Sequence, residues 1–296
     1  MCGIIGLLIK NRDEQRNLGA LMTPMFDCMA ERGPDSAGLA IFGDAAAGDL
    51  RIYSLFSDTD FQWLDEEAFE QHPVGPLSLR VQGNHALLTA SNQPQEWKAW
   101  IAKNFPPVHL LSIGKRIQLY KDQGHPMEIA KEYDFPHMAG THCVGHTRMA
   151  TESAVSPAHA HPFTAGEDFC LVHNGSLSNP YMLRRKLEAE GLHFETDNDT
   201  EAACRFIEWR MRQGATLDEA LETALVELDG FFTLLIATAD QLTLVRDAFA
   251  CKPAVVAETD AYVAISSEFR SLAHLPGVEN ATIFEPLPEV IYSWKV

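Results

Sequence analysis

Positive charge is scarce in this sequence, which limits the partners that it can have. The 296 residues contain 23 Lys and Arg against 41 Asp and Glu, a formal net charge of −18 at pH 7. No segment carries a block of Lys or Arg that could follow a phosphate backbone, whose charge dominates nucleic-acid binding. We therefore expect no nucleic acid among the partners of this protein.

Long hydrophobic runs are also missing. No window approaches the roughly 18 uninterrupted apolar residues of a membrane-spanning helix. The apolar run at residues 4–9 is too short for a signal peptide and follows no basic leader. The sequence thus predicts a cytoplasmic protein that makes no contact with a membrane.

Clustered cysteines are absent as well. The six cysteines never lie two or four residues apart, so neither a zinc site nor an iron–sulfur cluster finds its usual spacing. They are Cys2, Cys28, Cys143, Cys170, Cys204 and Cys251. We expect no metal and no cofactor in this chain, and this use of cysteine suits a reducing compartment.

One of these cysteines occupies the second position of the chain. If Met1 is removed, which the small side chain of Cys2 permits, a single residue carries both a thiol and a free α-amine. An α-amine titrates near pH ~8 and can take the thiol proton directly or through one water, which leaves a thiolate that attacks carbonyls. Taken alone, a cysteine at this position is better explained as a small buried residue.

The periodicity along the chain predicts two sheets with helices packed on them, an α+β arrangement. The expected strands are 3–9, 39–42, 141–146, 169–173, 231–238, 242–246, 254–257 and 262–266. The expected helices are 17–31, 180–187 behind an Asn179 N-cap, 199–212, and 217–228 behind a capping box at Thr216.

Residues 44–139 differ in character from the rest. They contain short strand-like runs near 50–56, 77–81, 86–90, 108–111 and 117–120, with one helical stretch near 94–103. Their histidines stand singly, whereas metal sites need clustered ligands. No catalytic spacing appears in this segment.

Four residues outside that segment could supply the oxyanion donors and the substrate-binding charges that a cysteine-dependent amidase specific for an amino acid needs. Asn174 can donate a side-chain N–H to a developing oxyanion, and Gly175 can present its backbone N–H at close range. Arg148 can bind a carboxylate through its guanidinium, and Asp199 can pair with an ammonium. Each residue alone has an ordinary structural explanation, as part of a turn, an ion pair or a helix cap.

Together and in this order, five short motifs resemble the class II glutamine amidotransferase domain. This is the N-terminal nucleophile hydrolase module of glucosamine phosphate synthase, amidophosphoribosyltransferase, asparagine synthetase and glutamate synthase. The motifs are Cys-Gly-Ile at 2–4, the stretch 32–38, Gly-His-Thr-Arg at 145–148, Val-His-Asn-Gly at 172–175 and Asp-Thr-Glu at 199–201. The resemblance implies a four-layer αββα sandwich over residues 1–296, with 44–139 as an inserted lobe or partner-docking surface.

The resemblance also implies a reaction, the hydrolysis of the side-chain amide of L-glutamine to ammonia and glutamate. Carried over position by position, Cys2 is the nucleophile, its α-amine is the base, and a γ-glutamyl thioester forms that water resolves. Asn174 and the Gly175 amide form the oxyanion hole. Arg148 and Asp199 hold the α-carboxylate and α-ammonium of glutamine.

Two further residues receive roles in the same way, and two positions depart from the family. Thr151 lies beside the substrate, and Arg32 supports the loop of the nucleophile. The residue after Arg148 is often aromatic in the family and is Met149 here, and an acidic Glu152 follows Thr151. A carboxylate so close to a substrate carboxylate costs affinity unless it turns away.

The chain ends about where the amidotransferase fold should end, so we expect the ammonia acceptor on a separate synthase subunit of a hetero-oligomer. Free-standing subunits with a long insertion look most like those of glutamate synthase-type complexes, including N-methylglutamate synthase, whose partner subunits carry flavin and iron–sulfur clusters.

Two alternatives stay open. One is another N-terminal cysteine amidase, which would not need Arg148 and Asp199 to recognise both ends of an amino acid. The other is a catalytically silent subunit with a structural or regulatory role. Retention of Met1 would favour it, since an acylated α-nitrogen cannot act as a base.

Overall fold

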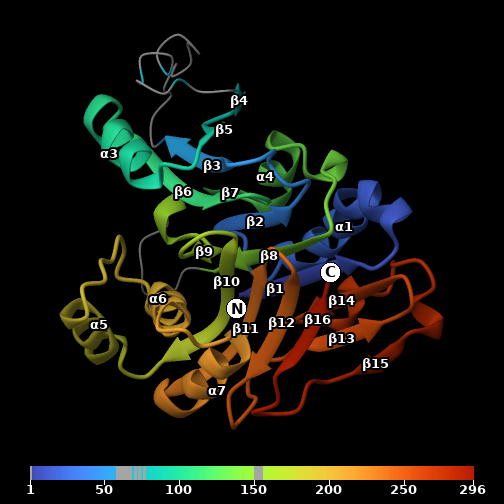
Figure 1. Cartoon of the computed structure of the whole chain (residues 1–296). Coiled ribbons are helices and arrows are strands. Elements are labelled where there is room, and N and C mark those ends of the chain that lie inside the picture. The colour runs from blue at the N-terminus through green and yellow to red at the C-terminus, as the bar shows by residue number, and fades with distance from the viewer. Residues whose placement is uncertain (1, 58–68, 70–71, 73–74, 76–77, 150–155) are drawn as a thin grey trace.

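The computed structural model describes residues 2–57, 69, 72, 75, 78–149 and 156–296. Its centre is a pair of antiparallel sheets that pack face to face (Figure 1). The first sheet has seven strands in the order β15 (Thr282–Phe284), β13 (Val255–Glu258), β14 (Tyr262–Ser266), β1 (Gly3–Ile9), β8 (His142–Arg148), β2 (Ser36–Phe42) and β7 (Ile117–Gln123). The second has five, in the order β16 (Tyr292–Lys295), β12 (Gln241–Arg246), β11 (Gly230–Thr238), β10 (Phe169–Leu177) and β9 (Phe163–Thr164).

Strand β1 shows why both faces of the first sheet are covered. Every one of its residues is buried, the pattern of a strand with packing on both sides. Because side chains alternate across a strand, Ile5 and Leu7 pack against Met22 and Phe26 of helix α1 (Leu18–Ala30), while Leu8 faces the second sheet. Burying each such side chain contributes about 1.5–3 kcal/mol.

The second sheet is covered in the same way by helices α6 (Asp199–Arg212) and α7 (Leu217–Glu227), with α5 (Pro180–Ala189) beside α6. Helix α7 begins at the predicted capping box, in which Thr216 and Glu219 bond each other's backbone N–H groups. The layers are therefore helix, sheet, sheet and helix, and the predicted αββα sandwich is confirmed.

The segment between β2 and β8 forms a separate lobe and one strand of the first sheet. Strands β4 (Ser78–Gln82), β5 (His85–Ser91), β3 (Leu50–Ser57) and β6 (Val108–Gly114) make a separate four-stranded sheet with helix α3 (Pro94–Asn104), around a core that includes Trp97. This lobe stands above β2 in Figure 1.

Strand β7, by contrast, hydrogen-bonds to β2 from Ser36 opposite Gln123 to Phe42 opposite Ile117. It is followed by helix α4 (Pro126–Glu132), which packs against α1. The described strands of the separate sheet thus lie within 50–114, whereas β7 and α4 pack on the sandwich.

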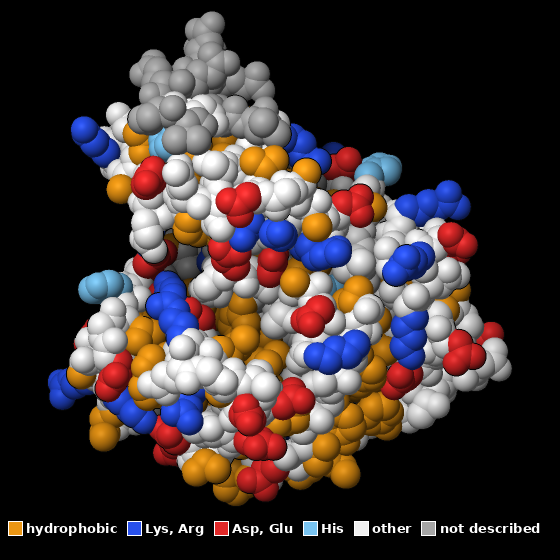
Figure 2. Space-filling model, viewed as in Figure 1, with side chains coloured by type: hydrophobic (Ala, Val, Ile, Leu, Met, Phe, Trp, Pro, Cys, Tyr) orange, Lys and Arg blue, Asp and Glu red, His pale blue; other side chains and the backbone are white. Residues whose placement is uncertain are grey.

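The surface carries both signs of charge. In Figure 2, Lys and Arg side chains alternate with Asp and Glu across the visible face. Among the described residues, no helix combines the length and the apolar character that crossing a bilayer would require.

Candidate active site

Cys2 lies at the end of the hydrogen-bond ladder between β1, the central strand of the first sheet, and its neighbour β8. Strand β1 runs antiparallel to β8 with Gly3 opposite Thr147, so Cys2 comes next to Arg148, the last residue of β8. The contact is close, because a Cβ on Gly3 would lie 2.8 Å from Oγ1 of Thr147. Cys2 is partly buried and belongs to no disulfide.

Arg32 holds the backbone of this cysteine. Its Nε donates a hydrogen bond to the Cys2 carbonyl at 3.2 Å, and its Nη1 pairs with Oε1 of Glu268 at 2.5 Å. The bond from Arg32 lowers the pKa of the Glu268 carboxyl, which keeps the ion pair charged. The residue that was predicted to support the nucleophile therefore touches it.

The turn after helix α1 packs on the backbone of Arg148. The N–H of Asp35 donates to the Arg148 carbonyl at 3.1 Å, and Ser36 lies opposite Arg148 in the β2–β8 ladder. A Cβ on Gly33 would lie 2.4 Å from the Arg148 nitrogen, so only glycine permits this approach. The Arg148 side chain is buried at this end of the sheet.

Asn174 and Gly175 stand on β10, in the sheet that faces Cys2. Asn174 is 5% exposed, and its Nδ2 has no hydrogen-bond partner among the described residues. Gly175 has φ +150°, and a Cβ there would lie 1.9 Å from the Phe231 carbonyl oxygen, which excludes every other residue. A buried N–H donor without a partner costs about 1–3 kcal/mol, a cost that a bound oxygen atom would remove.

Two histidines of β8 align the two sheets. Nε2 of His142 lies 2.8 Å from the carbonyl of Thr238, which pairs with Phe169 at the start of β10. Nε2 of His146 lies 3.2 Å from the carbonyl of His173, further along β10. Strands β8 and β10 therefore run in the same direction in the two facing sheets. At the ends of these strands, Arg148 lies opposite the Asn174–Gly175 pair.

Asp199 is tied to the same strand from the helix side. It is the first residue of α6, whose N-cap is Asn198 rather than Asp199 itself. Its Oδ2 accepts the Leu177 N–H at 2.9 Å, and its Oδ1 lies 3.9 Å from Nδ1 of His173. The carboxylate stays 24% exposed and can take a cation from outside.

The structure thus brings together five of the residues that the sequence singled out, namely Cys2, Arg32, Arg148, Asn174 and Gly175, with Asp199 anchored beside the last two. Thr151 and Glu152 lie outside the described residues, and Met149 is 39% exposed. Among the described residues, no three His, Cys, Asp or Glu side chains converge as metal ligands would.

Sequence reasoning missed two residues beside this site, His161 and Thr200. Thr200 Oγ1 lies 2.7 Å from Nε2 of His161 and 3.0 Å from Nδ1 of His173. The rings of His161 and His146 stack with their centroids 4.0 Å apart. Burial lowers the pKa of His146 to about 3, with the positive charge of Arg148 among the lesser causes, so the ring is neutral at neutral pH.

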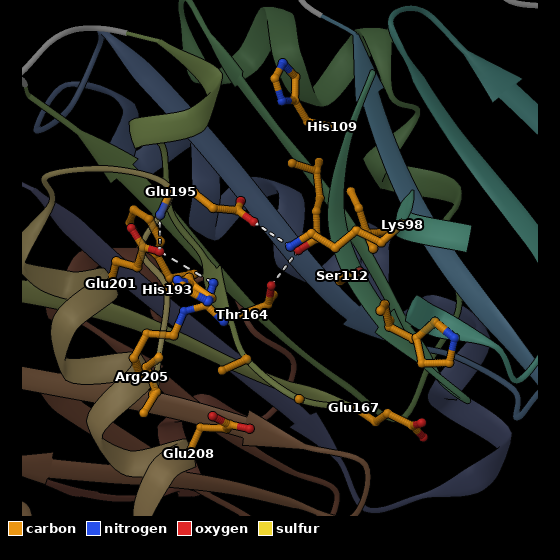
Figure 3. Close-up of a pocket in the computed structure, with 18 of the residues that line it drawn as sticks. Lys98, His109, Ser112, Thr164, Glu167, His193, Glu195, Glu201, Arg205 and Glu208 are labelled. Atoms are coloured by element: carbon orange, nitrogen blue, oxygen red, sulfur yellow. Dashed lines mark hydrogen bonds and ion pairs between the residues drawn. The ribbon is translucent and has the colours of Figure 1, made fainter. Parts of the chain in front are cut away.

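A separate cavity of about 550 Å³ lies between the lobe and the sandwich. Figure 3 shows Lys98 of α3 and Glu195 meeting across it, an ion pair of 3.1 Å, while Glu201, Arg205 and Glu208 reach it from α6. None of the described residues that were predicted to react with or bind glutamine lines this cavity.

Comparisons with known proteins agree with this geometry. A family model described as a glutamine amidotransferase domain matches residues 146–274. The glutamine amidotransferase-like protein GlxB of Rhizobium meliloti is 45% identical over 295 residues, which cover 99% of this chain and 98% of that protein. A putative glutamine amidotransferase of Methanothermobacter thermautotrophicus is 33% identical over 97% of both chains.

A solved structure shares the fold. The glutamine phosphoribosylpyrophosphate amidotransferase of B. subtilis aligns with 99% of this chain and 49% of its own, with a TM-score of 0.63 and 18% identity. At that level of identity the likeness concerns the fold alone.

Proposed function

This chain belongs to the class II glutamine amidotransferase family, and from that membership we propose that Cys2 is the nucleophile that hydrolyses the side-chain amide of L-glutamine. The observation that carries the proposal is the meeting of two sheets at one end of the sandwich. Cys2 and Arg148 end two paired strands of the first sheet, and Asn174 and Gly175 lie level with them on the second. A nucleophile and two oxyanion donors on facing surfaces are what acyl transfer requires.

The reaction would proceed through a thioester. After removal of Met1, the α-amine of Cys2 takes the thiol proton, and the thiolate attacks the amide carbon of glutamine. Nδ2 of Asn174 and the Gly175 N–H donate to the resulting oxyanion. When the carbon–nitrogen bond breaks, the α-ammonium returns its proton to the leaving nitrogen and ammonia departs. Water, deprotonated by the same amine, then releases glutamate and restores the thiol.

A charged side chain on the first sheet and one on helix α6 would hold the amino-acid end of the substrate. Arg148 can bind the α-carboxylate and Asp199 the α-ammonium, since a bidentate guanidinium and a partly exposed carboxylate suit those groups. Thr151 belongs to the same proposal, and Arg32 would fix the backbone of Cys2. Recognition of both ends favours glutamine over the acylated amines of other N-terminal cysteine amidases.

The ammonia would pass to a separate synthase subunit of a glutamate synthase-like or N-methylglutamate synthase-like complex, whose own subunits would carry any flavin or iron–sulfur cluster. The lobe of β3–β6 supports this extension, because it adds a separate sheet to the sandwich while none of its described residues belongs to the predicted glutamine site. We propose it as the surface on which the partner docks.

The test is ammonia release from L-glutamine by the purified chain, with the intact mass recorded on the same sample. We expect release from the chain that lacks Met1 and none from Cys2→Ala, with both chains equally folded by circular dichroism. Undiminished release by Cys2→Ala would refute the nucleophile. Silence of the wild-type chain without Met1, even together with a synthase partner, would favour the silent structural subunit.

A further inference from the structure

Four buried polar residues lie directly behind the Asn174–Gly175 pair, and the mechanism above gives none of them a role. They are His146, His161, His173 and Thr200, here called the histidine–threonine cluster, and each is at most 5% exposed. Polar side chains are costly to bury unless their hydrogen bonds are satisfied. The hydrogen bonds of these residues therefore show which neighbouring group the cluster holds in place.

Thr200 is the central member. Its Oγ1 contacts Nε2 of His161 at 2.7 Å and Nδ1 of His173 at 3.0 Å, and it lies 3.4 Å from Oδ1 of Asp199. A hydroxyl has a single proton to donate, so at least one of the two imidazoles must donate to it. The hydroxyl thus sets the orientation of both rings.

His146 holds the other side of His173. The carbonyl of His173 can only accept, so a neutral His146 must carry its proton on Nε2 to make the 3.2 Å contact. The His161 ring stacks on His146 and closes the cluster. The carbonyl of His173 is therefore bound by His146 and its ring by Thr200.

His173 immediately precedes the oxyanion pair, so this clamp acts on its backbone. The peptide bond from His173 to Asn174 includes the carbonyl that His146 binds. The His173 ring also lies against Gly175, since a Cβ there would be 2.7 Å from its Nε2. Nδ2 of Asn174 has no partner of its own among the described residues, so that nitrogen depends on its neighbours for its direction.

We propose that Thr200 and His146 are positioning residues, which hold His173 so that Asn174 and Gly175 aim their N–H groups at the oxyanion. The inference rests on the proposed function of that pair. Oxyanion donors act only when they are placed in advance of the reaction. Neither residue is assigned a contact with glutamine, and Asp199 keeps its 2.9 Å bond from the Leu177 N–H without Thr200. Loss of Thr200 or His146 should therefore affect the transition state more than substrate binding.

The first test replaces Thr200 by two residues that differ in the hydroxyl. Thr200→Val keeps the shape and removes the hydroxyl, and we expect it to lower kcat for ammonia release by about 10-fold or more, with KM within about 3-fold of wild type. Thr200→Ser keeps the hydroxyl and should retain kcat within about 3-fold. An equal loss in both variants, or a rise in KM alone, would overturn the proposal.

A matched pair of histidines separates positioning from simple stability. His142 and His146 lie on the same strand, are both fully buried, and each contacts a carbonyl of the second sheet, but His142 does so at the end away from the site. We expect His142→Ala and His146→Ala to lower the melting temperature alike, and only His146→Ala to lower kcat of the folded enzyme. A similar kcat in the two variants would mean that the cluster is structural only.

A measurement without turnover keeps this inference distinct from the proposed function. In the 15N-labelled chain, the side-chain amide resonance of Asn174 should shift in Thr200→Val and stay near its wild-type position in Thr200→Ser. An unmoved resonance in Thr200→Val contradicts the positioning role even in an active enzyme. A wild-type chain without Met1 that releases no ammonia, even together with a synthase partner, would instead refute the function, while the resonance still decides the positioning.

Discussion

Asn174 is buried, and its side-chain nitrogen stays without a partner among the described residues. We predict that Asn174→Ala lowers kcat for glutamine hydrolysis by about 100-fold or more with little change in KM, because an oxyanion donor acts mainly in the transition state. Steady-state ammonia release gives both constants.

A matched control is available a few residues along the chain. Asn179 caps helix α5 by accepting the Met182 N–H at 3.2 Å, is exposed, and is not among the predicted site residues. Asn179→Ala should cost about 1 kcal/mol of unfolding free energy and leave kcat unchanged. If Asn174→Ala raises KM and spares kcat, Asn174 binds glutamine and the oxyanion role is wrong.

At the scale of one element, the first turn of helix α6 joins Asp199, the residue proposed to bind the α-ammonium of glutamine, to the second sheet. Asp199→Asn keeps an oxygen that can accept the Leu177 N–H and removes the negative charge. We predict that KM for glutamine rises by about 10-fold to 100-fold with kcat largely kept, since a charge-assisted hydrogen bond contributes about 1.5–3 kcal/mol. Initial rates over a range of glutamine concentrations measure both quantities.

Asp218 provides the comparison, because it is also an acidic residue in the first turn of a helix, α7, but accepts a hydrogen bond from Ser293 of the edge strand β16 rather than from β10. Asp218→Asn should leave both constants unchanged. A drop in kcat for Asp199→Asn, with KM unaltered, would instead place Asp199 in the chemical step.

The elements that the sequence predicted well are those whose burial repeats along the strand or helix. Strand β1 and helix α7 have such patterns, and their observed bounds differ from the expected ones by a residue at most. The short edge strands β9, β15 and β16 were not predicted, because two to four partly exposed residues carry no readable period. In the sequence, the run at 117–120 resembles the other short strand-like runs of 44–139. Only its hydrogen bonding to β2 in the folded chain assigns it to the sandwich.

The candidate site was predictable where a motif carries the chemistry and unpredictable where tertiary packing supplies it. Cys2, Arg148, Asn174 and Gly175 each stand in a short recognisable motif. His161 stands apart from every motif, and its contact with Thr200 joins residues 39 positions apart. Such a pairing depends on how the loop after β8 and helix α6 meet, which no local pattern encodes.

For the whole molecule, buried histidines predict sensitivity to acid. Burial lowers the pKa of His85 and His146 to about 3 and that of His142 to about 4. Their rings bind protons more tightly in the unfolded chain, where the pKa returns to about 6.5. The contribution of these rings to the unfolding free energy is therefore nearly constant above about pH 7.5 and falls as the pH drops through 6.5, with a slope that approaches about 4 kcal/mol per pH unit for three rings well below that pH.

Urea denaturation at pH 7, 6 and 5 measures this loss. We expect His85→Gln to reduce the slope of the unfolding free energy against pH by the equivalent of about one proton. His193 is exposed, so His193→Gln should leave that slope as in wild type. A wild-type unfolding free energy that is constant from pH 7 to pH 5 would contradict the prediction.

The site is divided between two layers, with Cys2 and Arg148 on the first sheet and Asn174, Gly175 and Asp199 on or beside the second. During synthesis Cys2 emerges first, and the residues proposed to act with it emerge more than 140 residues later. If the proposed mechanism holds, a nascent or half-assembled chain has the thiol without the oxyanion donors and the substrate-binding residues. We therefore expect hydrolysis of glutamine to begin only when both sheets have folded against each other.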